Sequence, residues 1–374
     1  MEQKLKKVLF ITNIPAPYRV VFFNELGKKC DLTVIFESYR ASLNVQYNWN
    51  DDAIKNFKAI YLTKNPFNPN RIKLGILKHL NYRKYDIIIV TNYAYITETL
   101  YMAWLRLTGK RFLYETDGGI IKNDSKFKYG IKHLLLSMAN GYLSPSKESD
   151  NYIYHYTSSK SNIFRYNFTS ISKDDIIKKC LTEEEKNEIK SKLGINESKI
   201  VLAIGRFVHR KGFDILIKAF RQIHDEDVGL YIIGGLPTKE YEEAAGGMPN
   251  IHFGGFLKKE ELKQYMSISD LFVHPTREDI WGLVINEAMS YGLPVLTTNM
   301  CVAGVELLPQ NCIVRSEDVN GLKEKILEVI YDNDELKRMS DRNLEKIKKY
   351  TIEEMVNNHI NIFNTFKNEN STYK

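Results

Sequence analysis

Two acidic side chains, Asp279 and Glu287, flank a turn between a predicted strand and a predicted helix. The apolar strand ends near Val273, the helix begins near Leu283, and a second apolar strand follows the turn at 292–294. Ligands of open α/β sheets bind at the carboxyl ends of strands, where helix N-termini favour anions. The pattern therefore indicates a site for a polyhydroxyl ligand that carries phosphate, with carboxylates for the hydroxyls and backbone amides for the phosphate.

A basic loop follows the predicted strand 200–204 and contains Gly205, Arg206, Lys211 and Gly212. Glycines let the backbone turn tightly, and an arginine fork with a lysine point charge neutralises a pyrophosphate well. A basic loop by itself is more often a solvated surface. Together with the segment that carries Asp279 and Glu287, here called the acidic segment, the loop indicates a diphosphate site.

The acidic segment resembles the signature of the retaining glycosyltransferases called group 1 or family 4, which are built on two facing Rossmann-like domains (the GT-B architecture). The family pattern is Glu, seven residues, Glu, with phenylalanine and glycine after the first acid and Glu-Ala-Met at the second. Aspartate stands at the first position here, and Glu278 precedes it, so either acid is a candidate for the working group. The matching residues are Asp279, Trp281, Gly282, Glu287, Ala288, Met289, Gly292, Pro294 and Val295.

The resemblance implies roles for the residues of the second half. Arg206 and Lys211 would bind the diphosphate of a nucleotide sugar, a UDP-sugar first among the candidates, and would stabilise it as it departs. Glu287 would bind the ribose, and Asp279 would bind the hydroxyls of the transferred sugar. The alternative for Glu287 is a purely structural acid near the start of a helix, stabilised by the helix macrodipole. Phe256 and Leu257 would contact the nucleotide base, although ordinary turns would equally explain the glycine pair that precedes them. The remaining donor-binding candidates are Gly205, Gly282, Leu283 and Val284.

The first half offers three candidate residues for the acceptor site. Tyr18 and Arg19 follow a loop stiffened by prolines, where the family often has a glycine-rich loop, and they are candidates for contacting phosphate or acceptor. Surface placement is the alternative for both. Asp117 stands where many family members have a histidine beside the transferred sugar, and a carboxylate there can orient a hydroxyl or act as a base. An Asp-Gly-Gly turn without chemistry is the alternative.

The composition is that of a globular protein, with 374 residues, 43% hydrophobic and 26% charged, and a formal charge of +7 that is no nucleic-acid signature. Neither half has a Gly-x-Gly-x-x-Gly loop, which disfavours a dinucleotide oxidoreductase. The four cysteines and eight histidines lack metal-ligand spacing, so we expect no metal and no cofactor. No apolar run approaches the ~18 residues of a membrane span, and no signal peptide is expected, so we expect a cytoplasmic location.

Short β-branched runs separated by helical segments occur twice along the chain, which is typical of buried parallel strands. We therefore predict an α/β fold of two Rossmann-like domains with the active site in the cleft between them. The acceptor domain is expected at 1–175, a polar connector at 176–197 and the donor domain at 198–351. By the resemblance, the final helix at 352–374 returns to the acceptor domain.

A basic amphipathic helix is predicted at 126–138, where Phe127, Ile131, Leu134 and Met138 share one face. Such a helix can lie on an anionic bilayer, although an apolar stripe more often packs into a core. Many relatives glycosylate lipid-linked saccharides, which would suit peripheral membrane association.

The sequence thus predicts transfer of a hexose-type sugar from a nucleotide sugar, with retention, to a hydroxyl of a saccharide or lipid-linked saccharide. Cell-surface polysaccharide, such as capsule or exopolysaccharide, is the expected product. Two other classes stay open at this point. One is a nucleotide-sugar epimerase on the same fold, and the other is a relative that binds nucleotide sugar without turnover.

Overall fold

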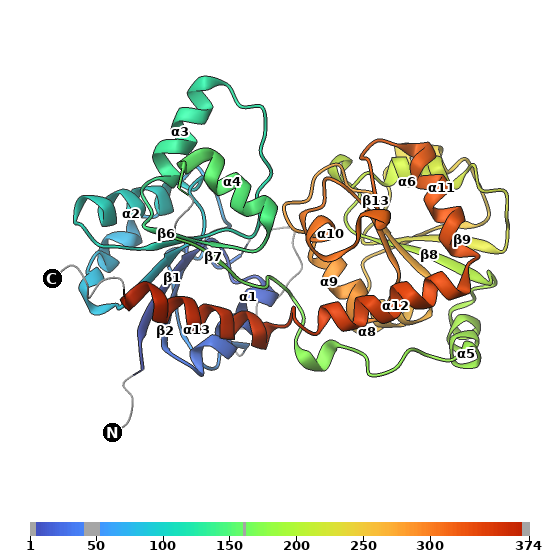
Figure 1. Ribbon diagram of the computed structural model, residues 1–374, viewed down its shortest axis with the longest axis horizontal. Helices are drawn as coiled ribbons and strands as arrows, with labels where there is room; N and C mark the ends of the chain where they lie inside the picture. The colour runs from blue at the N-terminus through green and yellow to red at the C-terminus, as the bar shows by residue number, and fades with distance from the viewer. Residues whose placement is uncertain (1–4, 41–52, 160–161, 369–374) are drawn as a thin grey trace. The chain divides into compact units, whose positions relative to one another are not determined.

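The computed structural model describes residues 5–40, 53–159 and 162–368. The chain divides into two compact units (Figure 1). Unit 1 comprises Met1–Ser170 and Thr351–Lys374, and unit 2 comprises Ile171–Tyr350. Each unit is built on one parallel sheet with helices packed on it, so the predicted α/β fold of two Rossmann-like domains is confirmed.

Unit 1 contains a seven-stranded sheet in the order β3-β2-β1-β4-β5-β6-β7, in which every neighbouring pair is parallel. The central strand β4 is apolar and buried along its whole length, and β1 is apolar between its two end residues, as expected for strands covered on both faces. The strand order reverses between β1 and β4, which is where open α/β sheets bind ligands. The strands are β1 (Lys7–Thr12), β2 (Asp31–Phe36), β3 (Lys58–Tyr61), β4 (Ile87–Val90), β5 (Leu113–Glu115), β6 (Gly141–Ser144) and β7 (Ile163–Arg165).

The helices of unit 1 are α1 (Pro17–Gly27), η2 (Leu74–His79), η3 (Tyr82–Lys84), α2 (Ile96–Leu107), α3 (Lys126–Leu136), α4 (Lys147–Thr157) and α13 (Ile352–Asn368). Residues of η2, α2, α3 and α4 pack in one core cluster on one face of the sheet. On the other face, the ring of Phe10 contacts Phe22 and Phe23 of α1 and His359 of α13. Figure 1 shows α2, α3 and α4 on one side of this sheet and α1 with α13 on the other.

Unit 2 contains a six-stranded parallel sheet in the order β10-β9-β8-β11-β12-β13. Its order reverses between β8 and β11, so this sheet also has a switch point at which a ligand can bind. The strands are β8 (Lys199–Ile204), β9 (Val228–Ile233), β10 (Ile251–Gly254), β11 (Leu271–His274), β12 (Val295–Thr298) and β13 (Ile313–Val314).

In unit 2, α6 packs on α7 and α11, α5 packs on α8, and α9 packs on α10 and α12. The longer helices are α5 (Glu183–Leu193), α6 (Phe213–Phe220), α7 (Lys239–Ala245), α8 (Lys259–Ile268), α9 (Leu283–Ser290), α10 (Val302–Leu307), α11 (Val319–Ile330) and α12 (Asn333–Ile347). The 3-10 helices are η4 (Lys173–Asp175), η5 (His209–Lys211) and η6 (Gln310–Cys312).

The strand predicted at 200–204 is β8, and the apolar strand predicted to end near Val273 is β11. No strand was predicted at the positions of β3 and β13. Both lie at an edge of their sheet, and edge strands are short and weakly patterned. The segment 176–197, predicted as a connector, falls within unit 2 in this division. It contains α5, which begins with a capping box between Thr182 and Glu185. No helix among the described residues is long and apolar enough to span a bilayer.

Candidate functional site

The loops that follow β8 and β11 meet at the carboxyl edge of the unit 2 sheet. Arg210 of the first loop accepts two hydrogen bonds at its carbonyl oxygen, from Oγ1 of Thr276 and the backbone amide of Arg277, both at 2.8 Å. Because β8 and β11 are neighbours at the switch point, the basic loop and the acidic segment of the sequence are brought together here.

The closest polar contact between these loops joins Lys211 and Asp279. Nζ of Lys211 lies 2.5 Å from Oδ2 of Asp279, and Nε2 of His274 lies 3.1 Å from the same oxygen. Arg210 is a more distant partner, with Nη1 3.8 Å from Oδ1. The carboxylate of Asp279 therefore faces Lys211 and Arg210. Glu278, the alternative acid, offers its carbonyl oxygen to Arg210.

Burial and these contacts shift the pKa values of Asp279 and His274. Burial alone would raise the pKa of Asp279, but the hydrogen bond from His274 and the charge of Lys211 hold that pKa below its ordinary value. Burial lowers the pKa of His274, and the hydrogen bond to Asp279 only partly opposes this effect. The site thus holds an ionised carboxylate beside a neutral imidazole that donates from Nε2.

Gly212 allows the two loops to approach this closely. Its φ is +69°, and a Cβ built on it would lie 2.0 Å from the carbonyl oxygen of Pro275 in the loop after β11. Any other residue would force the loops apart, because that oxygen belongs to the backbone and cannot move aside cheaply. The glycine therefore sets the distance across which Lys211 reaches Asp279.

Two further contacts fix the acidic loop. Arg277 makes a bidentate ion pair with Asp214 of α6, at 2.6 and 2.7 Å. The buried indole of Trp281 donates to Oδ1 of Asn286 at 2.9 Å, which ties the loop to α9. Bidentate arginine pairs and buried indole hydrogen bonds restrain a loop more than exposed pairs do.

The N-terminus of α9 completes this edge of the sheet. Gly282 precedes the helix with φ +100°, and no acidic side chain occupies the first turn. The amides of the first helical turn, including those of Leu283 and Val284, have no partner within the helix and suit an anion. Glu287 lies one turn further along and is half-buried.

The remaining donor-site candidates lie on the neighbouring loops. Phe256 follows β10 and is 76% exposed, and its ring lies against Gly235 at the end of β9. Leu257 beside it is half-buried. Arg206 is exposed and forms no ion pair with the described residues. Of the predicted donor-site residues, the structure joins Lys211 and Asp279 directly.

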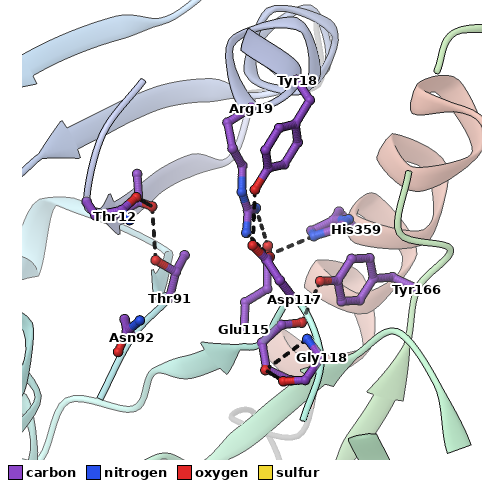
Figure 2. A network of polar contacts seen from close by, with 12 residues as sticks. Thr12, Tyr18, Arg19, Thr91, Asn92, Glu115, Asp117, Gly118, Tyr166 and His359 are labelled. Carbon is purple, nitrogen blue, oxygen red and sulfur yellow. Dashed lines mark hydrogen bonds and ion pairs between the residues drawn. The ribbon is translucent and has the colours of Figure 1, made fainter. Parts of the chain in front are cut away.

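Unit 1 holds its own charged cluster at the carboxyl edge of its sheet (Figure 2). Arg19, at the start of α1, forms ion pairs with Glu115 and Asp117 after β5. The hydroxyl of Tyr18 donates to Oδ2 of Asp117 at 3.1 Å. Arg19 is 4% exposed and Asp117 is 30% exposed, so the aspartate is the member that solvent reaches.

The C-terminal helix contributes to this cluster. Nε2 of His359 lies 3.0 Å from Oε2 of Glu115, and Tyr166 donates to the carbonyl oxygen of Thr116 at 2.7 Å (Figure 2). Both contacts hold the loop that carries Asp117. Burial and the charge of Glu115 raise the pKa of Asp117, and Arg19 only partly offsets that increase.

Polar groups at the ends of β1 and β4 lie near this cluster in Figure 2. Oγ1 of Thr91 donates to Oγ1 of Thr12 at 3.0 Å. The amides of Thr91 and Asn92 donate to Oε2 of the buried Glu98, at 3.1 and 2.8 Å. Asn13, Thr91 and Asn92 stand at the switch point of the unit 1 sheet, where a hydroxylated ligand would meet donors and acceptors.

Sequence reasoning named Asp117, Asp279, Lys211, Tyr18 and Arg19 as candidates but did not name His274, Glu115 or His359, which contact members of these clusters. His274 lies five residues before Asp279 in the chain, so a histidine at a strand end close to an acid was an available signal. Glu115 and His359 are far apart in the sequence, and only the fold brings them together. Among the described residues, no group of three or more histidine, cysteine or acidic side chains is arranged to hold a metal ion.

The sequence profile described as "Glycosyl transferases group 1" matches residues 185–346, which lie within unit 2. The chain carries a group 1 glycosyltransferase domain. The contact between Lys211 and Asp279 and the N-terminus of α9 all lie inside this group 1 domain.

Curated relatives of the group 1 domain include two bacterial glycosyltransferases. The lipopolysaccharide glucosyltransferase WaaG of Escherichia coli K12 is 31% identical over 130 residues, which cover 33% of this chain and 34% of WaaG. The O-antigen biosynthesis glycosyltransferase WclY of Escherichia coli is 28% identical over 176 residues, 45% of each chain. The matched regions therefore span less than half of each relative.

The fold of the whole chain is similar to solved structures. Sucrose-phosphate synthase from Thermosynechococcus elongatus has a TM-score of 0.73 at 16% identity, with 96% of this chain and 99% of that chain covered. HepE from Anabaena, solved in complex with UDP-glucose, has a TM-score of 0.72 at 14% identity, with 97% and 100% covered. The group 1 domain thus lies in a chain whose fold is that of two-domain glycosyltransferases.

Proposed function

We propose that this protein transfers a sugar from a nucleotide diphosphate sugar to a hydroxyl group of a saccharide or glycolipid. The observation that carries the proposal is the 2.5 Å contact between Lys211 and Asp279 within the group 1 domain. This contact supports the proposal, because a cation suited to a diphosphate and a carboxylate suited to sugar hydroxyls lie at the same switch point as the N-terminus of α9.

In the proposed reaction, the bond between the anomeric carbon and the diphosphate oxygen breaks, and its electron pair leaves with the diphosphate. Lys211, Arg206 and the amides of Leu283 and Val284 stabilise that charge as it develops. The acceptor hydroxyl oxygen forms the new bond to the anomeric carbon and loses its proton. We assign retention of configuration and a metal-independent course, in which protein cations serve the diphosphate.

On the donor side, Glu287 binds the ribose, Phe256 and Leu257 contact the base, and Asp279 binds hydroxyls of the sugar. UDP is the proposed nucleotide, because HepE of the same fold was solved with UDP-glucose. The diphosphate competes with Asp279 for Lys211, because these two side chains contact each other in the structure.

On the acceptor side, Asp117 orients or deprotonates the acceptor hydroxyl. Its raised pKa suits a group that exchanges a proton, since proton transfer is most efficient when the catalytic pKa approaches the working pH. Arg19 was a candidate phosphate contact, but it is buried between two carboxylates, so we assign it the positioning of Asp117. Tyr18 supports the same carboxylate through its hydroxyl.

We also propose peripheral association with the inner face of the cell membrane through α3. Phe127, Ile131 and Leu134 are 80%, 42% and 63% exposed, so these residues face solvent, whereas Met138 packs against the core. Lys126 and Lys128 on the same helix would attract anionic lipid. A cytoplasmic reaction on a lipid-linked precursor of a cell-surface polysaccharide fits relatives named for lipopolysaccharide and O-antigen synthesis.

The test is a donor panel of UDP-, GDP- and ADP-sugars, with release of nucleoside diphosphate as the readout. We expect release from one nucleotide class, dependent on a saccharide acceptor and insensitive to EDTA. Lys211→Ala and Glu287→Ala are each expected to abolish donor binding, whereas Lys192→Ala on α5, which is 69% exposed, serves as the matched control.

Each other outcome of the panel contradicts the proposal in a specific way. An altered free nucleotide sugar formed without acceptor would indicate an epimerase. Binding without turnover for every donor and acceptor would indicate a non-catalytic relative. Full donor binding in both variants would exclude the assigned pocket.

A further inference from the structure

An apolar stripe runs along the outer surface of α2. Ile96, Leu100, Trp104 and Leu107 are 37%, 48%, 37% and 84% exposed. Their spacing of four, four and three residues places them on one helical stripe. The opposite stripe, which includes Tyr101, packs into the core of unit 1, so α2 is apolar on both faces.

The neighbouring η2 segment extends this apolar surface. Ile72, Leu74 and Leu77 are 43%, 70% and 59% exposed. The segment lies directly beside α2, because Tyr101 donates to the carbonyl oxygen of His79 at 3.1 Å. The indole of Trp104 also donates to the carbonyl oxygen of Leu80, at 3.4 Å. We call the combined surface of 70–84 and 96–108 the α2 face.

The charges on the α2 face have one sign. The sequence of the two segments contains a single acid, Glu98, which is buried and accepts hydrogen bonds from the amides of Thr91 and Asn92. The exposed charged side chains of the α2 face are all basic, and they are Arg71, Lys78, Arg83, Lys84 and Arg106.

Seven exposed apolar side chains together are unusual, because single exposed apolar residues are common but contiguous patches mark binding surfaces. An apolar centre with basic residues and a tryptophan matches the boundary between lipid headgroups and acyl chains. A second copy of this chain is disfavoured, since two α2 faces in contact would oppose cations with cations.

We propose that the α2 face docks on a bilayer that contains anionic phospholipids, with its apolar side chains inserted at the headgroup boundary. The proposal rests on the membrane association proposed above and adds a contact surface separate from α3. Both surfaces belong to helices on the same side of the unit 1 sheet, as Figure 1 shows. Contact through two elements strengthens binding, because the second contact forms without new loss of translational freedom.

The experiment is sedimentation of the full chain with vesicles of phosphatidylcholine alone or with phosphatidylglycerol. Leu100→Glu/Leu107→Glu is the α2-face variant, Phe127→Glu/Leu134→Glu is the α3 variant, and Val21→Glu is the control. Val21 is 42% exposed on α1, on the opposite side of the same sheet. All five substituted positions are exposed, so the variants should fold, and their melting curves verify this.

We expect the wild type and Val21→Glu to bind the anionic vesicles, with binding weakened by salt, and the α2-face variant to lose about tenfold or more in affinity. Unchanged binding of the α2-face variant would overturn the inference. A loss confined to the α3 variant would do the same while leaving the proposed membrane association intact. A dimer in solution that the α2-face variant abolishes would assign the surface to a second copy and also overturn the inference. Sugar transfer is measured in a separate assay, so a failure to transfer sugar is distinguished from a failure to bind vesicles.

Discussion

Nε2 of His359 lies 3.0 Å from Oε2 of Glu115, although 244 residues separate them in the chain (Figure 2). The other ring nitrogen, Nδ1, lies 2.7 Å from the carbonyl oxygen of Met355. Each ring nitrogen therefore lies against an oxygen atom, one within α13 itself and one at the end of β5. The imidazole thus ties the C-terminal helix to the carboxylate that pairs with Arg19.

We predict that His359→Leu destabilises unit 1 by about 3 kcal/mol, because the buried carboxylate of Glu115 is left without one of its hydrogen-bond partners. His359→Gln keeps one donor and is expected to lose less. Urea denaturation followed by circular dichroism measures both variants. A His359→Leu protein as stable as the wild type would show that the contact with Glu115 contributes nothing.

Acid stability provides a second measurement of the same cluster. Burial alone would raise the pKa of Glu115, but the charge of Arg19 and the hydrogen bond from His359 lower it to about 2. The folded-state pKa is below that of the unfolded chain, so this group stabilises the fold at neutral pH and loses that contribution as the pH falls toward 2. We expect His359→Leu to unfold at a higher pH than the wild type in an acid titration. Coincident titration curves would contradict the assignment.

Gly212 and Gly194 form a matched pair for testing the loop contact. Both have φ +69°, but a Cβ at 212 would lie 2.0 Å from the carbonyl oxygen of Pro275, whereas nothing lies within 4 Å at 194. We predict that Gly194→Ala costs ~1 kcal/mol of unfolding free energy from the left-handed backbone. Gly212→Ala should cost at least ~2 kcal/mol more, because the two loops must separate. Equal melting temperatures of the two variants would show that the loops separate without cost.

Asp279→Asn separates the binding of the diphosphate from the handling of the sugar. The carboxylate now holds Nζ of Lys211 at 2.5 Å, so its loss leaves that cation free for phosphate. We expect UDP alone to bind the variant at least as tightly as the wild type in calorimetry. Transfer of sugar should fall by roughly 100-fold, a loss of about 3 kcal/mol of transition-state stabilisation. Weaker UDP binding with unchanged transfer would reverse these roles.

Much of the fold was predictable because parallel strands are continuous apolar runs. β4 consists of four β-branched residues, all buried, as the short β-branched runs of the sequence predict for a strand of a parallel sheet. The amphipathic pattern of 126–138 also predicted α3, but a helical stripe cannot by itself show whether a neighbour covers it, and three of its residues proved exposed.

The sequence by itself determined the family of the C-terminal domain, the two-part α/β fold and the residue types of the candidate donor site, because these features depend on local spacing. Only the tertiary structure decided that Lys211 contacts Asp279, that Arg19 is buried between Glu115 and Asp117, and that His359 joins them. Ion pairs of this kind connect residues that are distant in the chain, and their partners are selected by strand order and helix packing. The same reason explains the α2 face, whose apolar residues look like core in the sequence and become a surface because no other described element packs over them.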